Sequence, residues 1–187
     1  MRKLIYSIAV SLDGYINDPN GSLSWVPVDE EYHRFANVQQ AETGLSIYGT
    51  RMWQTMRYWD TAEAQPGQTD YTLEFARIWK PAEKLVVSRS LSESDMLAGA
   101  RLFRGDVVAE VRRLKQQPGQ QIAVAGATLA SVLVDAGLID EIQPFVVPAV
   151  LGGGTPFLTA SSASKYQLMD SRRFANGMTF LRCARLA

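Results

Sequence analysis

The sequence predicts an α/β protein in which short buried strands alternate with helices. Apolar runs of strand length, such as Leu85-Val86-Val87, recur between segments whose apolar residues have helical spacing. Near the C-terminus, two strand-like runs flank Asn176-Gly177, a pair that strongly favours a two-residue hairpin turn. We therefore expect β-α units first and an antiparallel hairpin last, in a single domain over residues 1–187.

Local patterns predict the individual elements. Continuous apolar runs predict strands over residues 3–11, 45–48, 84–88, 121–125 and 142–150, with a further short strand possible at 15–16. Apolar residues three or four apart, in one case after an acidic first turn, predict helices over residues 29–41, 49–56, 71–79, 106–116 and 128–136. The hairpin strands cover residues 166–174 and 178–184.

Proline and glycine mark breaks in this pattern. Pro144 and Pro148 interrupt the predicted strand at 142–150, and proline is mostly confined to edge strands or bulges because it lacks an N–H donor. We therefore expect an edge strand or a bulge there. Residues 60–70 are polar, contain Pro66-Gly67 and predict a loop.

The composition limits the class of protein. The chain has 187 residues, is 47% apolar and 20% charged, and carries 19 Lys and Arg against 19 Asp and Glu. This is the profile of a globular domain, without the basic excess typical of nucleic-acid and membrane-surface proteins. No apolar run approaches the roughly 18 residues of a membrane span. We therefore expect a cytoplasmic protein with no nucleic-acid or membrane partner.

Cysteine and histidine each occur once, which limits the possible sites. Cys183 alone cannot form an internal disulfide, and with His33 it cannot complete a Cys/His metal site, so no metal is predicted. A single histidine without an evident partner spacing does not indicate a Ser/His/Asp triad. His33 falls in the predicted helix over 29–41, where we expect it on a solvated face.

Three junctions between a strand and the following segment are candidates for binding an anion. Glycine or small residues let a ligand approach the backbone, and a helix N-terminus offers free N–H groups and a positive dipole end. The junctions are Gly49-Thr50-Arg51, Ser88-Arg89-Ser90 and Gly126-Ala127-Thr128-Leu129. Taken singly, the first is also typical of a tight turn, the second of a capping turn, and the third of close helix–strand packing. All three follow predicted strands, so together they predict a phosphate-binding edge of the sheet.

Two further groups of residues are weaker candidates. Gly152-Gly153-Gly154-Thr155 offers backbone N–H groups to a phosphate, but a flexible loop between strands explains it as well. The tryptophans are more typical of packing than of a stacking platform. Trp25 is the exception, because it follows a turn-rich loop that should overhang the sheet edge.

Five motifs, in order, resemble a known family. They are Ser11-Leu12-Asp13-Gly14-Tyr15-Ile16, Gly49-Thr50-Arg51-Met52-Trp53, Lys84-Leu85-Val86-Val87-Ser88-Arg89-Ser90-Leu91, Gly126-Ala127-Thr128-Leu129 and, after Leu138-Ile139-Asp140-Glu141, Pro148-Ala149-Val150-Leu151-Gly152-Gly153-Gly154. From end to end the chain resembles the dihydrofolate reductase-like superfamily, in the branch with the C-terminal reductase domain of bifunctional riboflavin-biosynthesis enzymes.

The resemblance implies both a fold and an activity. The fold is a three-layer α/β/α arrangement around a mixed, mainly parallel sheet with a C-terminal antiparallel hairpin. The activity is that of an NADPH-dependent reductase that acts on a small-molecule substrate of the pterin or aminopyrimidine kind. The resemblance also implies a homodimer. The alternative is an NADP(H)-binding module without catalytic turnover. Such a module would bind the cofactor, but no substrate would oxidise it.

The resemblance also implies roles for individual residues. Gly49, Thr50 and Arg51 would hold cofactor phosphates, Ser88 and Arg89 the adenosine 2′-phosphate, Gly126, Ala127, Thr128 and Leu129 the pyrophosphate, and Ala9 and Ile16 would line the nicotinamide. Two positions depart from the family pattern. Ala127 stands where glycine is usual, so its methyl group could crowd the pyrophosphate, and Asn17 stands where a small residue is common.

The acid that would support catalysis is Asp29. The segment Trp25-Val26-Pro27-Val28-Asp29 is similar to the tryptophan–proline–carboxylate segment of dihydrofolate reductases, one residue shorter. By that match Asp29 would face a substrate nitrogen and support its protonation. Aspartate is also a favoured helix N-cap, so a purely structural role stays open. Asp13 is the other acid that the family offers, with loop ordering as its alternative role.

Overall fold

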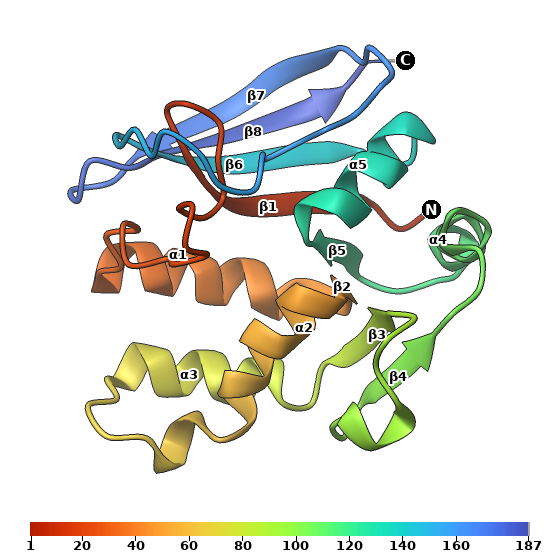
Figure 1. The fold of residues 1–187 in the computed structure, drawn as a ribbon, viewed down its shortest axis with the longest axis horizontal. Coiled ribbons are helices and arrows are strands. Elements are labelled where there is room, and N and C mark those ends of the chain that lie inside the picture. Colours follow the sequence, from red (N-terminus) through yellow and green to blue (C-terminus); the bar gives the residue numbers. More distant parts are fainter. Residues whose placement is uncertain (187) are drawn as a thin grey trace.

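The computed structural model describes residues 1–186 and contains one eight-stranded mixed sheet (Figure 1). Its order is β4-β3-β2-β5-β1-β6-β8-β7. The strands are β1 Leu4–Ser11, β2 Thr43–Gly49, β3 Glu83–Val87, β4 Ala100–Phe103, β5 Gln121–Ala125, β6 Glu141–Val147, β7 Tyr166–Arg173 and β8 Thr179–Arg185. The pairs from β4 to β6 are parallel, whereas β8 runs antiparallel to β6 and to β7. The predicted mainly parallel sheet with a C-terminal hairpin is confirmed.

The helices of the described chain lie between the first six strands in sequence. They are α1 Glu30–Ala41, α2 Thr50–Met56, α3 Asp70–Trp79, α4 Val107–Gln116 and α5 Ala127–Asp135. Side chains accept hydrogen bonds at the N-termini of three of them, from Asp29 for α1, Thr69 for α3 and Asp106 for α4. Such caps satisfy N–H groups that a helix leaves unpaired in its first turn. The remaining two helices, α2 and α5, begin after glycine without a side-chain cap.

The helices cover both faces of the sheet and produce three layers. Successive strand residues point to opposite faces. Ile47 therefore joins the apolar cluster that includes Val111 of α4, while its neighbour Tyr48 packs with Trp53 and Trp79 on the other face. On that second face, a further cluster lies between the C-terminal strands and α1. The tryptophan at position 53 is fully buried, and Trp79 nearly so, which agrees with the expected packing role.

The proline-containing strand differs from the prediction of an edge strand or a bulge. β6 lies inside the sheet, between β1 and β8. Pro144 pairs with Ile8 of β1, whereas the pairs between β6 and β8 leave out Gln143 and Pro144. Because proline cannot donate to the ladder, the sheet tolerates it by a local gap in one pairing. The register is the same on both sides of this gap, so a strand with proline need not lie at an edge.

Other boundaries also differ from the sequence prediction. The edge strand β4 was not predicted, because its four residues lack a continuous apolar run. The possible strand at 15–16 is a single bridge between Tyr15 and Pro156. The segment predicted as a loop at 60–70 includes a short 3₁₀ turn, Ala62–Ala64, after another at Arg57–Asp60.

Candidate functional site

The three predicted junctions lie together at one edge of the sheet. They follow the carboxyl ends of β3, β2 and β5, which are neighbours in that order. The Thr50 hydroxyl donates to Ser88 Oγ over 2.9 Å, which connects the first two junctions. A methyl group built on Gly126 would lie 3.7 Å from the backbone nitrogen of Gly49, so the third junction is next to the first. Parallel α/β sheets bind ligands at this edge.

The N-terminus of α5 presents unpaired backbone donors to this edge. The first helical hydrogen bond runs from the N–H of Ala130 to the carbonyl of Gly126. Within residues 1–186, the N–H groups of Ala127, Thr128 and Leu129 have no hydrogen-bond partner. Gly126 has a φ of +115°, a conformation that favours glycine, and it provides no side chain to cap the helix. The helix dipole and these free donors suit an anion.

The methyl group of Ala127 does not obstruct this helix end. Ala127 is only 5% exposed, so its side chain is packed inside the protein instead of facing a ligand. The departure from glycine at this position therefore places no methyl group over the helix end.

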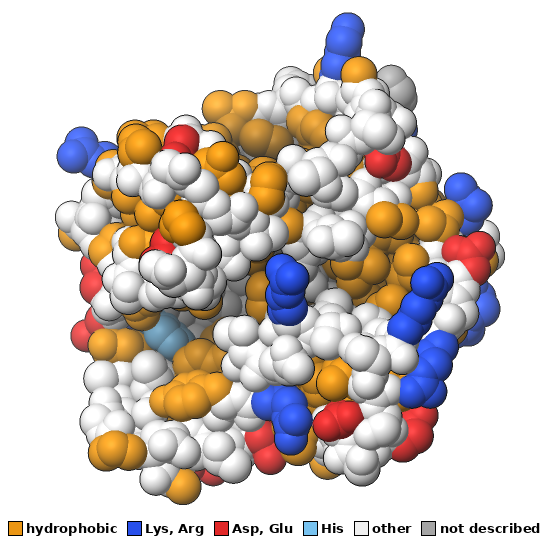
Figure 2. Space-filling view, viewed as in Figure 1, with side chains coloured by type: hydrophobic (Ala, Val, Ile, Leu, Met, Phe, Trp, Pro, Cys, Tyr) orange, Lys and Arg blue, Asp and Glu red, His pale blue; other side chains and the backbone are white. Residues whose placement is uncertain are grey.

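Basic side chains without acidic partners surround the same edge. Arg51 and Arg89 are exposed, and in the part of the chain that the structure covers neither forms an ion pair. Arg104, just after β4, is exposed as well and donates to the carbonyl of Leu91 rather than to a carboxylate. Figure 2 shows basic side chains across the middle and right of this face, around a hollowed centre. Among the described residues these arginines thus form no ion pair, although the chain as a whole carries equal numbers of basic and acidic residues.

A hollow of about 520 Å³ adjoins Arg51. Its other walls are the turn at 17–21 and the glycine-rich segment, at Gly154 and Thr155. These two segments are joined by hydrogen bonds, because the N–H of Ile16 donates to the carbonyl of Thr155 over 2.9 Å and the N–H of Thr155 donates to Asn17 Oδ1 over 2.7 Å. The side chain of Asn17, which departs from the family pattern, thus fixes the wall of this hollow.

Asp13 fixes the same loop from the other side. Its carboxylate accepts from Ser11 Oγ over 2.6 Å and from the N–H groups of Gly152 and Leu151 over 2.7 and 3.1 Å. The hydrogen bond from Ser11 lowers the pKa of Asp13, and the bonds from the backbone of Gly152 and Leu151 lower it further. A carboxylate held in this way remains charged and orders the loop.

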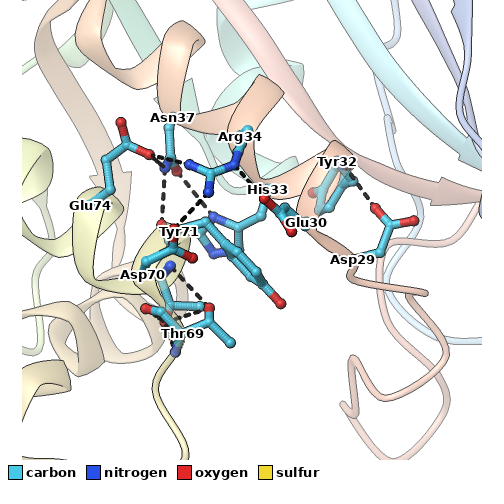
Figure 3. Close-up of polar contacts among 11 residues, drawn as sticks. Asp29, Glu30, Tyr32, His33, Arg34, Asn37, Thr69, Asp70, Tyr71 and Glu74 are labelled. Atoms are coloured by element: carbon cyan, nitrogen blue, oxygen red, sulfur yellow. Dashed lines mark hydrogen bonds and ion pairs between the residues drawn. The ribbon is translucent and has the colours of Figure 1, made fainter.

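Asp29 is the N-cap of α1. One of its carboxylate oxygens accepts from the N–H of Tyr32 over 2.8 Å, and the side chain is partly exposed (Figure 3). Its second oxygen has no hydrogen bond within residues 1–186. The geometry therefore combines the structural role considered for this residue with one free carboxylate oxygen.

Three predicted site residues are more buried than the arginines. They are Ser88 and the two residues expected at the nicotinamide, Ala9 and Ile16. Ser88 is 5% exposed, and its Oγ accepts from the N–H groups of Ser90 and Leu91 over 3.2 and 3.1 Å. It therefore holds the turn that presents Arg89. Ala9 lies at the border of the cluster under α1, and Ile16 is buried where its loop pairs with Thr155.

The prediction that His33 lies on a solvated face is wrong. It is 7% exposed and lies between α1 and α3, against the rings of Trp59, Tyr71 and Phe75. Helix α1 has two packing surfaces, one against the sheet and one against α3. The apolar spacing that predicted the helix marks only the first of them, so sequence reasoning missed the second.

Polar side chains complete the contact between α1 and α3 (Figure 3). Asn37 is 2% exposed and donates to the carbonyl of Tyr71 and to the carboxylate of Glu74. Arg34 forms ion pairs with Glu30 of its own helix and with Asp70 and Glu74 of α3. The spacing of Arg34 from Glu30 is the only part of this network visible in the sequence.

Known structures share this architecture. A protein from Shewanella sp. PV-4 named for riboflavin biosynthesis superposes with a TM-score of 0.73 at 21% identity, over 99% of both chains. A pyrimidine reductase-like protein from Corynebacterium diphtheriae gives 0.65 at 10% identity, over 100% of this chain and 92% of that one. The diaminohydroxyphosphoribosylaminopyrimidine deaminase/5-amino-6-(5-phosphoribosylamino)uracil reductase of Thermotoga maritima gives 0.69 at 15% identity, and 57% of its length is matched.

The sheet order, the layers and these structures define a dihydrofolate reductase-like α/β/α protein. The model of the RibD C-terminal domain matches residues 2–180, and the chain belongs to that family. Two Bacillus subtilis (strain 168) proteins are also similar, each over 95% of this chain. The uncharacterized protein YyaP is 29% identical over 92% of its own length, and the uncharacterized protein YwjB is 28% identical over 95% of its length. No helix within residues 1–186 has the length and apolar character needed to cross a membrane.

Proposed function

We propose that the protein is an NADPH-dependent reductase of a small pterin-like or aminopyrimidine compound, and that it acts in the cytoplasm as a homodimer. The observation that carries this proposal is the meeting of three junctions at one sheet edge, with free helix donors and unpaired arginines. Membership of the RibD C-terminal domain family supports the choice of a reductase.

The residues present at the edge fit a dinucleotide phosphate. The free N–H groups of Ala127, Thr128 and Leu129 would hold the pyrophosphate, because a helix N-terminus stabilises anionic oxygens. No atom lies within 4 Å of the position that a side chain on Gly49 would take, so the backbone there is open to a ligand. Arg51 would add a charged donor beside it. The Thr50 hydroxyl, which donates to Ser88 Oγ in this structure, would add a neutral donor by turning toward the phosphate.

Arg89 would bind the 2′-phosphate that distinguishes NADPH from NADH. It is exposed, carries no ion pair among the described residues, and stands on a turn that the buried Ser88 hydroxyl holds in place. Ser88 would then act by fixing that turn, with the neighbouring Ser90 offering an exposed hydroxyl. A planar guanidinium suits a phosphate monoester.

The bound cofactor would supply the hydride for a C=N or C=O group, and the chain would supply position and a proton. Ala9 and Ile16 would border the nicotinamide. Asp29 would use its free carboxylate oxygen to contact a substrate nitrogen, directly or through water, while the other oxygen caps α1. Asp13 would keep the loop at the edge ordered.

The second candidate is a module that binds NADP(H) without turnover. It is favoured by one observation, namely that both candidate acids already have structural partners: Asp13 accepts from three groups, and Asp29 caps its helix. The two candidates agree about the cofactor and differ only in whether any substrate oxidises it.

The cofactor role of Arg89 predicts a selective loss of affinity. The substitution Arg89→Ala should weaken NADPH binding by about ten- to a hundredfold, corresponding to ~1.5–3 kcal/mol for one charge-assisted contact, and leave NADH binding nearly unchanged. Titrations that follow tryptophan fluorescence measure both constants. Arg112→Ala is the matched control, because Arg112 is also exposed but lies on α4. Equal losses for the two nucleotides would contradict the assignment.

The role of Asp29 predicts a loss of turnover without a loss of folding. Asparagine caps helices about as well as aspartate, so Asp29→Asn should keep the thermal midpoint and the NADPH affinity. Oxidation of NADPH, followed with dihydrofolate and aminopyrimidines as trial substrates, should fall by about 10²-fold or more for a lost proton-transfer group. Unchanged turnover would leave Asp29 as a cap alone. If the wild type oxidises NADPH with none of these compounds, the binding module is the better description.

A further inference from the structure

His33 has one ring nitrogen whose protonation state is fixed by its neighbours. Asn37 directs its amide nitrogen to two groups that can only accept, the carbonyl of Tyr71 and the carboxylate of Glu74. Its carbonyl oxygen must therefore face His33 Nδ1, at 3.0 Å. Since that oxygen can only accept, Nδ1 carries the hydrogen. In the neutral ring, Nε2 is then an acceptor.

The neutral ring is the favoured form at this place. Burial among aromatic rings lowers the pKa of His33, although the hydrogen bond with Asn37 opposes this shift. The charge of Glu74 also opposes the shift, while Arg34 of α1 pairs with Glu30 and with Asp70 and Glu74 of α3; burial is the largest of these effects, so the pKa stays lowered. Nε2 thus presents a lone pair and not a second donor.

The second ring nitrogen, Nε2, is unpartnered and reaches the surface. It has no hydrogen bond within residues 1–186. The fully enclosed polar side-chain atoms that lack a hydrogen bond in this part of the chain are Gln40 Nε2 and Arg182 Nε. His33 Nε2 is not one of them, so it is in contact with solvent. Figure 2 shows the surface of the histidine in pale blue at the left of the hollowed face, between α1 and α3 as they lie in Figure 1. A solvent-reaching acceptor in an otherwise aromatic pocket is suited to a ligand that brings a donor.

The surroundings favour a flat ring. Trp59 lies edge-on to His33, with ring centroids 5.7 Å apart, and is itself partly exposed. Tyr58 next to it is 44% exposed. Trp59 also packs against Tyr58 and Phe75, and the exposed parts of these rings offer aromatic surface to a planar ring. His33 also follows Asp29 by one helical turn, since its N–H donates to the Asp29 carbonyl over 3.0 Å.

We propose that the hollow beside His33 in Figure 2 is the substrate groove, and that His33 Nε2 and Trp59 form a subsite of it that selects a flat heteroaromatic ring carrying an N–H donor. The proposal deepens the reductase function above and rests on it for the identity of the groove. His33 is here a specificity-determining residue: it contacts the substrate and leaves the bond changes to the cofactor and Asp29.

Nuclear magnetic resonance of the single histidine tests this subsite directly. In the ¹⁵N-labelled full chain, the imidazole should show a protonated Nδ1 and an unprotonated Nε2. The probe 4-aminopyrimidine should move the Nε2 signal and leave Nδ1 in place, whereas pyrimidine, which lacks N–H donors, should not move it. An Nε2 signal that stays still while 4-aminopyrimidine is titrated, whether or not the probe binds elsewhere, overturns the proposal.

A variant separates recognition from packing. His33→Phe keeps a ring between Trp59 and Phe75 and removes the acceptor, so the affinity for 4-aminopyrimidine should fall about tenfold, as expected for one hydrogen bond. NADPH affinity should not change. An unchanged affinity for the probe would overturn the proposal even if the variant is less stable. A wild-type protein that fails to bind NADPH but shows the Nε2 response would refute the reductase, and not the subsite.

Discussion

Gly154 and Asn17 show how single residues shape the candidate site. Gly154 has a φ of +128°, and a methyl group there would lie 1.9 Å from the carbonyl oxygen of Asn17. Real side-chain carbons do not approach an oxygen so closely. The side chain of Asn17 meanwhile holds the N–H of Thr155. The wall of the hollow is therefore fixed by a glycine that has no room for a side chain and by the hydrogen bond from the Thr155 N–H to Asn17 Oδ1.

This contact predicts different costs for two neighbouring glycines. Gly152 also has a positive φ, +72°, but nothing lies within 4 Å of the place of its side chain. Gly152→Ala should therefore cost only the backbone strain, about 1–2 kcal/mol. Gly154→Ala adds a steric clash and should cost clearly more, or release the loop locally. Urea denaturation gives the first quantity, and hydrogen exchange at Thr155 detects the second. Equal behaviour of the two variants would contradict the tight contact.

At this scale the sequence predicts backbone roles better than side-chain roles. Gly49 and Gly126 stand at the predicted junctions because a strand followed by glycine and a helix is a local pattern. The burial of the Ser88 hydroxyl and the position of His33 depend on Thr50 and on α3, which are distant in sequence. No local pattern contains that information.

Among the elements, strand β3 has a buried lysine as its second residue. Lys84 is 2% exposed, and its Nζ donates to the carbonyls of Lys80 and Ala82 over 2.9 and 2.7 Å. It lies 4.2 Å from the ring centre of Trp79. The ammonium group thus satisfies carbonyls at the end of α3, where a cation is favoured by the helix dipole.

The burial of Lys84 predicts a pH dependence of stability. Burial lowers the pKa of Lys84 from 10.5 to about 8, and the charge of Asp60 opposes this shift. Between these values the unfolded chain binds more protons than the folded one, so the free energy of unfolding should rise with pH from about 8 to 10.5. The contribution is at most about 3 kcal/mol. Below pH 8 it should be constant.

Urea denaturation of wild type and Lys84→Met at pH values across this window measures the contribution. The rise should be absent from Lys84→Met and retained in Lys165→Met, because Lys165 is exposed. Parallel pH profiles for wild type and Lys84→Met would show that Lys84 is not responsible.

The elements that sequence reasoning placed well are those with a strong local pattern. The hairpin around Asn176-Gly177 and the helix after Gly126 are examples, and both are present. β4 and the internal position of β6 were not predictable, since each depends on which strand lies beside it. Pro144 indicated a disturbance correctly, but the pairing with β1 decides that it lies inside the sheet.

In the molecule as a whole, basic and acidic residues are equal in number, but some basic residues without an acidic partner within residues 1–186 lie at one edge of the sheet. The net charge is zero, and many basic residues are paired, as Arg34, Arg113 and Lys115 are. Arg51, Arg89 and Arg104, which follow three neighbouring strands, have no acidic partner among the described residues. An anionic ligand would complete this edge. We therefore propose that the three junctions form one NADPH site.

The measurement that tests this claim most directly is a titration of the wild-type protein with NADPH and, separately, with NADH, following tryptophan fluorescence. We expect saturable binding with a clear preference for NADPH, at least about tenfold, because the 2′-phosphate adds one charge-assisted contact. Absence of binding by either nucleotide, or equal binding of both, would contradict this expectation.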